Sequence, residues 1–123
     1  MEIKLVDTNI LIDFLKGDSK IVDKIGFKNL AVNDIVIMEL FQGAKSKSDL
    51  NFIKKSIRKI NILEINQDII TLAKDILQEY NLSHNMKIND AIIASTSIIY
   101  SLELVTFNKK DFKFIPDIKL VEI

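Results

Sequence analysis

Three acidic residues of this chain lie in apolar surroundings, where an ionised carboxylate is costly. Asp7 follows a short apolar run near the N-terminus, Glu39 lies inside the apolar segment 35–41, and Asp90 directly precedes the apolar segment 91–94. A buried carboxylate needs a cation, hydrogen-bond donors or a raised pKa. A bound divalent metal ion would satisfy all three acids, and hard oxygen ligands suit Mg²⁺ or Mn²⁺. The first hypothesis is therefore a carboxylate metal site.

Simpler structural roles remain open for two of these acids. Asp7 could be the N-cap of a helix that follows it, as could Thr8. Asp90, at the start of a predicted helix, could complement the helix dipole. Glu39 has the weakest explanation of this kind, because a residue in the middle of an apolar helix caps nothing.

The composition limits the remaining chemistry. The chain has no Cys and a single His, which excludes disulfides, thiolate metal sites and Cys nucleophiles and nearly excludes a His-based triad. Carboxylate, hydroxyl, Lys and metal chemistry remain. The 17 basic and 17 acidic residues give a formal net charge of zero, so any contact with nucleic acid would have to come from a local patch.

Size and hydropathy indicate one domain over residues 1–123. The length of 123 residues and the 48% apolar content suit a single domain with a real core. No segment resembles a signal peptide, and the most apolar later stretch, residues 91–100, is shorter than the ~20 residues that span a bilayer. We therefore expect a soluble, cytoplasmic protein without a membrane segment.

The pattern of apolar residues predicts strands that alternate with helices. The predicted strands are residues 3–6, 30–32, 60–65, 102–106 and 118–121. The predicted helices are residues 9–16, 21–25, 34–44, 49–59, 67–80 and 89–100, with a loop at 81–87 that contains His84. Such alternation indicates a mostly parallel sheet with helices on both faces, whose active site lies outside the carboxyl ends of the strands. Asp7 and Thr106, with Asn108 and Asp111 after it, should fall on the same edge.

Four positions also carry a resemblance to a known family. Residues 6–13, VDTNILID, resemble the opening motif of PIN domains, especially the VapC-type toxins of prokaryotic toxin–antitoxin pairs. Residues 89–94, NDAIIA, resemble the third motif of the family, and residues 106–112, TFNKKDF, resemble the last. Glu39 matches the second acid of the family. The resemblance covers essentially the whole chain in the expected order.

The resemblance implies a three-layer α/β/α sandwich with a central, mostly parallel sheet and one pocket for one or two Mg²⁺ or Mn²⁺ ions. The acids that it implies as metal ligands and catalytic residues are Asp7, Glu39, Asp90 and Asp111. The hydrogen-bonding groups that it implies around them are Thr8, Asn9, Thr106 and Asn108. Some relatives have Asp at the position of Asn108, which here would be a neutral ligand or an orienting group.

The family cuts RNA, so the resemblance implies a metal-dependent endoribonuclease that is the toxin partner of a small antitoxin. Because Cys is absent and only one His is present, the nucleophile expected is water activated by the metal. Lys109 and Lys110 flank Asp111 and are the best-placed candidates for RNA contact. The resemblance also implies a homodimer and an apolar antitoxin segment in a groove near the site. Candidate residues for these two surfaces are Phe14, Phe41 and Phe52.

Two other functions compete with this interpretation. A Mg²⁺-dependent phosphatase or phosphotransferase of another α/β fold often has an Asp nucleophile after its first strand. A second carboxylate two residues later would favour that class, but Asn9 stands there. A non-catalytic PIN-like scaffold that binds RNA or protein would be favoured by loss of one of the four acids, and all four are present.

Overall fold

The computed structural model describes residues 2–123 and contains a four-stranded sheet in the order β3-β2-β1-β4. The strands are β1 (Lys4–Val6), β2 (Leu30–Asn33), β3 (Asn61–Leu63) and β4 (Leu104–Val105). All three neighbouring pairs are parallel, so all four carboxyl ends lie at one edge of the sheet. The chain runs from β1 outward to β2 and β3 and then returns to the other side of β1. The strand order therefore reverses at β1, which lies between β2 and β4. Open α/β sheets bind their ligands at such a reversal, outside the carboxyl ends of the strands.

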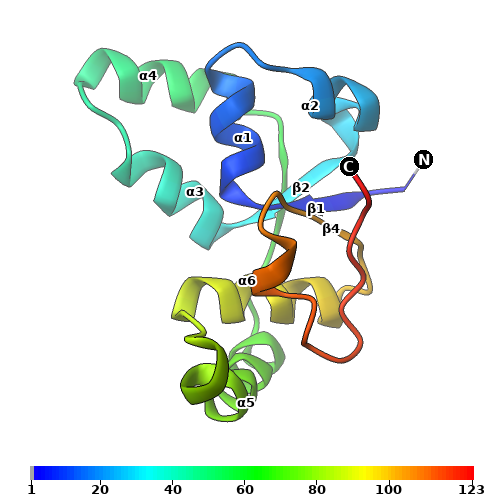
Figure 1. Ribbon diagram of the computed structural model, residues 1–123. Coiled ribbons are helices and arrows are strands. Elements are labelled where there is room, and N and C mark those ends of the chain that lie inside the picture. Colours follow the sequence, from blue (N-terminus) through cyan, green and yellow to red (C-terminus); the bar gives the residue numbers. More distant parts are fainter. Residues whose placement is uncertain (1) are drawn as a thin grey trace.

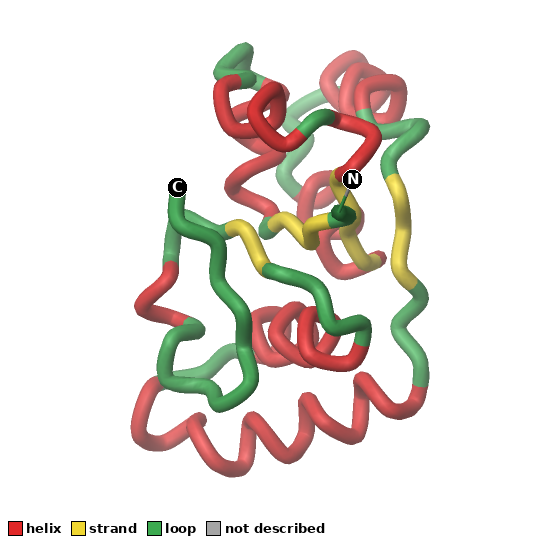
Figure 2. Tube along the Cα trace, turned by 90° about the vertical axis from the view of Figure 1, so that its right-hand side faces the viewer, coloured by secondary structure: helices red, strands yellow, loops and turns green. Residues whose placement is uncertain are grey.

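Among residues 2–123, six α-helices cover the two faces of the sheet. They are α1 (Thr8–Leu15), α2 (Lys20–Ile25), α3 (Asp34–Gln42), α4 (Lys47–Ser56), α5 (Gln67–His84) and α6 (Ile88–Ile99). Helices α1 to α4 lie on one side, and α5 and α6 lie on the other (Figure 1). Figure 2 shows α6 between the sheet and the long helix α5. This arrangement confirms the predicted three-layer α/β/α sandwich with a parallel sheet. Within residues 2–123, no helix combines the length and the hydropathy that a membrane crossing requires.

Two strands lead directly into a helix through a polar residue that caps it. Asp7 follows β1 directly and is the N-cap of α1, while Asn33, the last residue of β2, is the N-cap of α3. The side chain of Asn33 accepts a 3.1 Å hydrogen bond from the backbone N–H of Val36. A capping side chain satisfies one of the free N–H groups of the first turn. These short connections hold the starts of α1 and α3 at the carboxyl edge of the sheet.

The core fixes the strands and α6 in place. Leu5 and Val6 of β1 and Leu104 and Val105 of β4 are fully buried, and so is the α6 segment from Ala91 to Ala94, apart from a 9% exposure of Ile92. Strands buried on both faces read as continuous apolar runs, as the sequence does here. The strands β1 and β4 and the helix α6, which carry part of the candidate site, are therefore deeply buried.

The prediction of a loop at residues 81–87 was wrong in its first half. Helix α5 continues through His84 and ends at Asn85, which adopts a left-handed conformation with φ 52°. Asn tolerates this conformation better than most residues and commonly ends a helix. The ring of His84 stacks on Phe114 with ring centroids 3.9 Å apart. This contact comes from a distant part of the chain, so local sequence signals could not reveal it.

The last predicted strand, at residues 118–121, was also wrong. Leu120 forms only a single parallel bridge with Leu104, although Leu104 N–H donates to the carbonyl of Lys119 and Val121 N–H donates to that of Leu104. Its partner β4 is only two residues long, so no longer ladder can form. The predicted helix at 49–59 is shifted as well: α4 begins at Lys47 because Ser46 caps it.

Candidate active site

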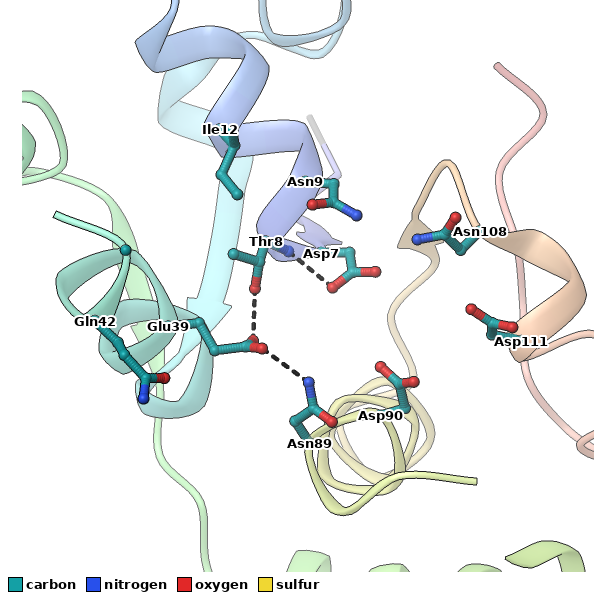
Figure 3. A pocket seen from close by; sticks show the side chains of 11 residues that line it. Asp7, Thr8, Asn9, Ile12, Glu39, Gln42, Asn89, Asp90, Asn108 and Asp111 are labelled. Atoms are coloured by element: carbon teal, nitrogen blue, oxygen red, sulfur yellow. Dashed lines mark hydrogen bonds between the residues drawn. The ribbon is translucent and has the colours of Figure 1, made fainter. Parts of the chain in front are cut away.

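A cavity of about 410 Å³ opens at the carboxyl edge of the sheet, and its walls come from four separated parts of the chain. The acids in its walls are Asp7, Glu39, Asp90 and Asp111. The other predicted site residues in its walls are Thr8, Asn9 and Asn108, and the walls also include Ile12, Gln42, Gly43 and Asn89. The structure therefore brings all four predicted acids to one pocket. Figure 3 shows the side chains of these residues around the central space.

Asp7 lies in the centre of the pocket and is held from three directions. Its backbone N–H donates to the carbonyl of Val105 in β4 at 3.0 Å. Its Oδ1 accepts a 2.8 Å hydrogen bond from the backbone N–H of Thr8, and its Oδ2 accepts a 2.9 Å bond from the hydroxyl of Thr106. Asp7 therefore caps α1 and also lines the pocket, so the two interpretations of this residue are compatible.

Glu39 extends from α3 and is held at both oxygens. The hydroxyl of Thr8 donates to Oε1 at 2.7 Å, and the side-chain amide of Asn89 donates to Oε2 at 2.8 Å (Figure 3). Thr8 was predicted to be one of the hydrogen-bonding groups around the acids, whereas no such role was predicted for Asn89. The one feature of the sequence that could have indicated this role is that Asn89 directly precedes Asp90. Thr8 thus contacts two acids, Asp7 through its N–H and Glu39 through its hydroxyl.

Asp90 lies in the first turn of α6, whose N-cap is Lys87 and not Asp90. Burial raises the pKa of Asp90 to about 6, with further contributions from the charges of Asp7, Asp111 and Glu39, while the charge of Lys87 opposes the shift. Within residues 2–123, no hydrogen bond to the Asp90 carboxylate is found. A first-turn acid is favourable for the helix dipole, yet this pKa shows that the pocket disfavours its ionised form.

The pKa of Asp7 is raised for the same main reason. Burial is the largest cause, the charges of Glu39 and Asp111 add to it, and the hydrogen bonds from Thr8 and Thr106 oppose it. The ion pairs within residues 2–123 are Lys4–Glu103 and Lys109–Glu122, and neither includes a pocket acid. The pocket therefore concentrates negative charge that the surrounding protein only partly compensates.

Asp111 enters the pocket from the wall opposite Glu39 (Figure 3). It is the last residue of the short 3₁₀ helix Lys109–Asp111, and the next residue, Phe112, is fully buried and anchors this turn. Just before the turn, the backbone N–H of Asn108 donates to the hydroxyl of Thr106 at 3.0 Å. Thr106 therefore joins the segment that carries Asp111 to Asp7.

The two predicted RNA-contacting residues differ in their surroundings. The Lys109 ammonium donates to Glu122 at 3.0 Å, whereas Lys110 is exposed. A surface ion pair of this kind contributes at most about 1 kcal/mol to stability. The ammonium group of Lys109 can therefore leave Glu122 and bind another anionic group. Lys110 nevertheless offers the freer positive charge next to Asp111.

The donor set of the pocket fits a hydrated divalent cation. Its polar groups are carboxylates, amides and a hydroxyl, which are the hard oxygen ligands that Mg²⁺ prefers. Among residues 2–123, no three acidic or His side chains lie close enough together to hold a bare ion. Mg²⁺ retains several water molecules when it binds to proteins. A site with widely spaced carboxylates is compatible with an ion that keeps part of its water shell.

A second cavity of about 380 Å³ adjoins the acidic pocket, since Ile12, Glu39 and Gly43 line both. Its remaining walls are mainly apolar, and they include Leu15, Leu40, Phe52 and Ile53. We call this cavity the apolar groove.

Of the three Phe residues predicted to lie at binding surfaces, Phe52 is 52% exposed in the apolar groove and Phe41 is 38% exposed outside it. Phe14 instead packs against the core, with its ring centroid 5.7 Å from that of Phe27.

Comparison with known proteins identifies the family. The sequence profile of the PIN domain matches residues 4–117. The chain is 28% identical to a protein named ribonuclease VapC from Rickettsia bellii, over 97% of this chain and 95% of that protein. It is 34% identical to a chain in a toxin–antitoxin complex from Klebsiella pneumoniae, with a TM-score of 0.79 and coverage of 97% and 96%.

A second solved structure shares the fold. It is a chain of the DNA-bound VapBC from Salmonella typhimurium, which has a TM-score of 0.84 at 24% identity and covers 98% of each chain. The profile match spans β1 through the segment that follows Asp111, and so includes all four acids of the pocket. The chain belongs to the PIN domain family.

Proposed function

We propose that this chain is a metal-dependent endoribonuclease and the toxin component of a toxin–antitoxin pair. The observation that carries the proposal is the convergence of four acids, from the start of α1, from α3, from α6 and from the turn after β4, on one negatively charged pocket. Membership of the PIN domain family, a relative named ribonuclease VapC and a similar chain in a toxin–antitoxin complex support this function.

The cofactor is Mg²⁺ or Mn²⁺, and the acids of the pocket hold it. Asp7 and Asp90 would be its direct ligands, and Glu39 and Asp111 would hold it either directly or through water. The bound metal supplies positive charge that stabilises the transition state and lowers the pKa of water. The pKa values of Asp7 and Asp90, raised mainly by burial, support this assignment because a cation would favour their ionised forms.

The remaining groups of the pocket orient the acids and the RNA. The backbone N–H of Thr8 donates to Oδ1 of Asp7, and the hydroxyl of Thr106 donates to Oδ2. Asn9 and Asn108 line the pocket with neutral amides, which donate hydrogen bonds to phosphate oxygens without repelling them. Hydrolysis adds the oxygen of water to phosphorus and breaks the bond from phosphorus to one ribose oxygen, and that oxygen takes up the proton that the water gives up.

The partners are RNA, a small antitoxin and a second copy of the chain. The antitoxin places an apolar segment in the apolar groove, because the groove offers exposed Phe52 beside the acidic pocket. An occupant of this groove would lie next to Glu39, which lines both cavities. Binding there would therefore block access of RNA to the acids.

The test is cleavage of purified RNA by the purified chain. We expect cleavage with Mg²⁺ or Mn²⁺, none with EDTA, and loss of most activity in Asp7→Asn and Asp90→Asn with an unchanged circular dichroism spectrum. Asp13→Asn is the matched control, because Asp13 lies on α1 but not in the pocket. If Asp90→Asn cleaves RNA as well as the parent, the site assignment fails. Mn²⁺ binding without any cleavage would favour a non-catalytic scaffold.

A further inference from the structure

The carboxylate of Glu39 is bound by two donors that come from opposite walls of the pocket. Thr8 belongs to the first turn of α1 and donates to Oε1 at 2.7 Å, and Asn89 belongs to the first turn of α6 and donates to Oε2 at 2.8 Å. Each donor is also the chain neighbour of another acid, Asp7 in one case and Asp90 in the other. The position of Glu39 is therefore set relative to both of these acids by single hydrogen bonds.

Asn89 is held rigidly by the helix on which it lies. The residues that follow it in α6, from Ala91 through Ser97, are buried against the sheet and α5. The backbone of Asn89 therefore cannot move without displacing the core. Its amide bridges to α3, and the side-chain amide of Asn33, the N-cap of α3, donates a further hydrogen bond to Thr96 of α6 at 3.0 Å.

The chemical nature of the amide suits this position. A Lys or Arg at position 89 would fix Glu39 equally well, but it would cancel negative charge that a divalent cation needs. An amide donates a hydrogen bond to the carboxylate, and because the acceptor is ionised this bond is stronger than a neutral one. Asn89 therefore orients Glu39 and leaves its charge in the pocket.

We propose that Asn89 is a positioning residue, which fixes Glu39 between α3 and α6 so that its carboxylate meets the metal ion in a single orientation. This inference rests on the proposed function. Residues that hydrogen-bond to metal ligands typically change metal affinity or activity by about 10–100-fold when they are replaced. Replacement of Asn89 should thus change metal affinity strongly, although Asn89 itself need not contact the metal.

The test is a double-mutant cycle on Mn²⁺ affinity, measured by titration calorimetry with Asn89→Ala, Glu39→Ala and the double variant. We expect Asn89→Ala alone to weaken Mn²⁺ binding by about tenfold. In the Glu39→Ala background the same change should weaken binding by less than about threefold, because a residue that acts through Glu39 has nothing left to position. Asn81→Ala, on the exposed surface of α5, is the control and should leave Mn²⁺ affinity unchanged.

A second measurement does not depend on metal or activity. In the metal-free protein, the side-chain amide protons of Asn89 should exchange with solvent more slowly than those of Asn81, and Glu39→Ala should remove the difference. Equal effects of Asn89→Ala in the two backgrounds, or equally fast exchange at Asn89 and Asn81, would overturn the inference. If the parent binds Mn²⁺ but does not cleave RNA, the proposed function fails while the cycle still decides the role of Asn89.

Discussion

The hydroxyl of Thr106 donates a 2.9 Å hydrogen bond to Oδ2 of Asp7, joining residues that are 99 positions apart in the chain. Asp7 follows β1 and Thr106 follows β4, and these strands are parallel neighbours at the reversal of strand order. The same hydroxyl accepts a hydrogen bond from the backbone N–H of Asn108. One side chain thus links the central acid to the segment that carries Asp111.

Replacement of Thr106 by Val should therefore strongly lower the rate of RNA cleavage while the protein remains folded. The variant keeps the shape and burial of the side chain but removes the donor to Asp7, and loss of a bond of this type is expected to reduce activity by about 10–100-fold. Thr106→Ser keeps the hydroxyl and is the matched control. The measurement is the initial rate of RNA cleavage at saturating Mg²⁺. Equal rates for the Val and Ser variants would show that the hydrogen bond has no role in catalysis.

Lys110 should contribute to RNA binding and not to chemistry. It is exposed beside Asp111, so Lys110→Glu should raise KM several-fold and leave kcat nearly unchanged. Each lost phosphate contact on a single strand should reduce the slope of log affinity against log salt by about 0.7. Lys113→Glu is the control, because Lys113 is also exposed but is not adjacent to Asp111 in the chain. If both variants change KM equally, the effect reflects overall charge and not a local contact.

The apolar groove gives a third prediction, about the antitoxin. Phe52 is a large exposed side chain in the groove, and buried aromatic anchors of this type contribute about 2–4 kcal/mol to binding. Phe52→Asp should therefore weaken binding of the proposed antitoxin by at least tenfold, without slowing RNA cleavage by the free chain. Phe41→Asp is the control, since Phe41 is exposed outside the groove. Binding can be measured by calorimetry, and an effect of Phe41→Asp as large as that of Phe52→Asp would place the contact elsewhere.

Much of the fold was predictable because the signals were local. Alternating strands and helices gave the parallel sandwich, and apolar runs that end in a polar residue placed Asp7 at the carboxyl edge of the sheet. Topology alone predicted that Asp7 and the segment with Asp111 lie at the same edge. The resemblance to the PIN family added Glu39 and Asp90 to the same pocket. Local signals were weaker at element ends, which explains the missed last turn of α5 and the absent strand at 118–121.

The role of Asn89 could not be predicted in the same way. Its hydrogen bond reaches Glu39 across 50 positions in the chain, and it depends on how α3 and α6 are placed relative to each other. Periodicity gives the face on which a residue lies but not the atom that it meets. The groove beside the pocket is likewise a product of packing, since Ile12, Leu40 and Phe52 come from three separate helices.

Metal affinity should depend on pH through Asp90. Its pKa is raised to about 6, so the carboxyl group is ionised at pH 7.5 and mostly protonated at pH 5. Because a metal ligand must be deprotonated, Mn²⁺ affinity should fall by up to about tenfold for each pH unit below about 6. Calorimetric titrations at pH 7.5, 6 and 5 would measure this, with Asp90→Asn as the comparison. A parent affinity that stays constant over this range would show that protonation of Asp90 does not compete with the metal.

The raised pKa of Asp90 also predicts that this residue destabilises the metal-free fold. A group whose pKa is higher in the folded than in the unfolded protein contributes stability below its unfolded pKa of about 4, and this contribution is lost as pH rises through about 6. At pH 7.5 the metal-free parent therefore carries the full penalty. Asp90→Asn removes the charge while nearly keeping the shape, and allowing for solvent screening at this half-buried group it should gain on the order of 1–2 kcal/mol.

Metal should reverse this order of stability. Excess Mg²⁺ stabilises whichever form binds it, in proportion to the logarithm of its concentration over the dissociation constant. The free energy of unfolding of the parent should therefore rise much more with Mg²⁺ than that of Asp90→Asn. The same side chain thus assists metal binding and destabilises the metal-free protein. Four thermal melts at pH 7.5, parent and variant each with EDTA or excess Mg²⁺, make the comparison. A metal-free variant that melts below the metal-free parent would mean that Asp90 chiefly stabilises the first turn of α6, and that repulsion among the pocket acids is not what governs its behaviour.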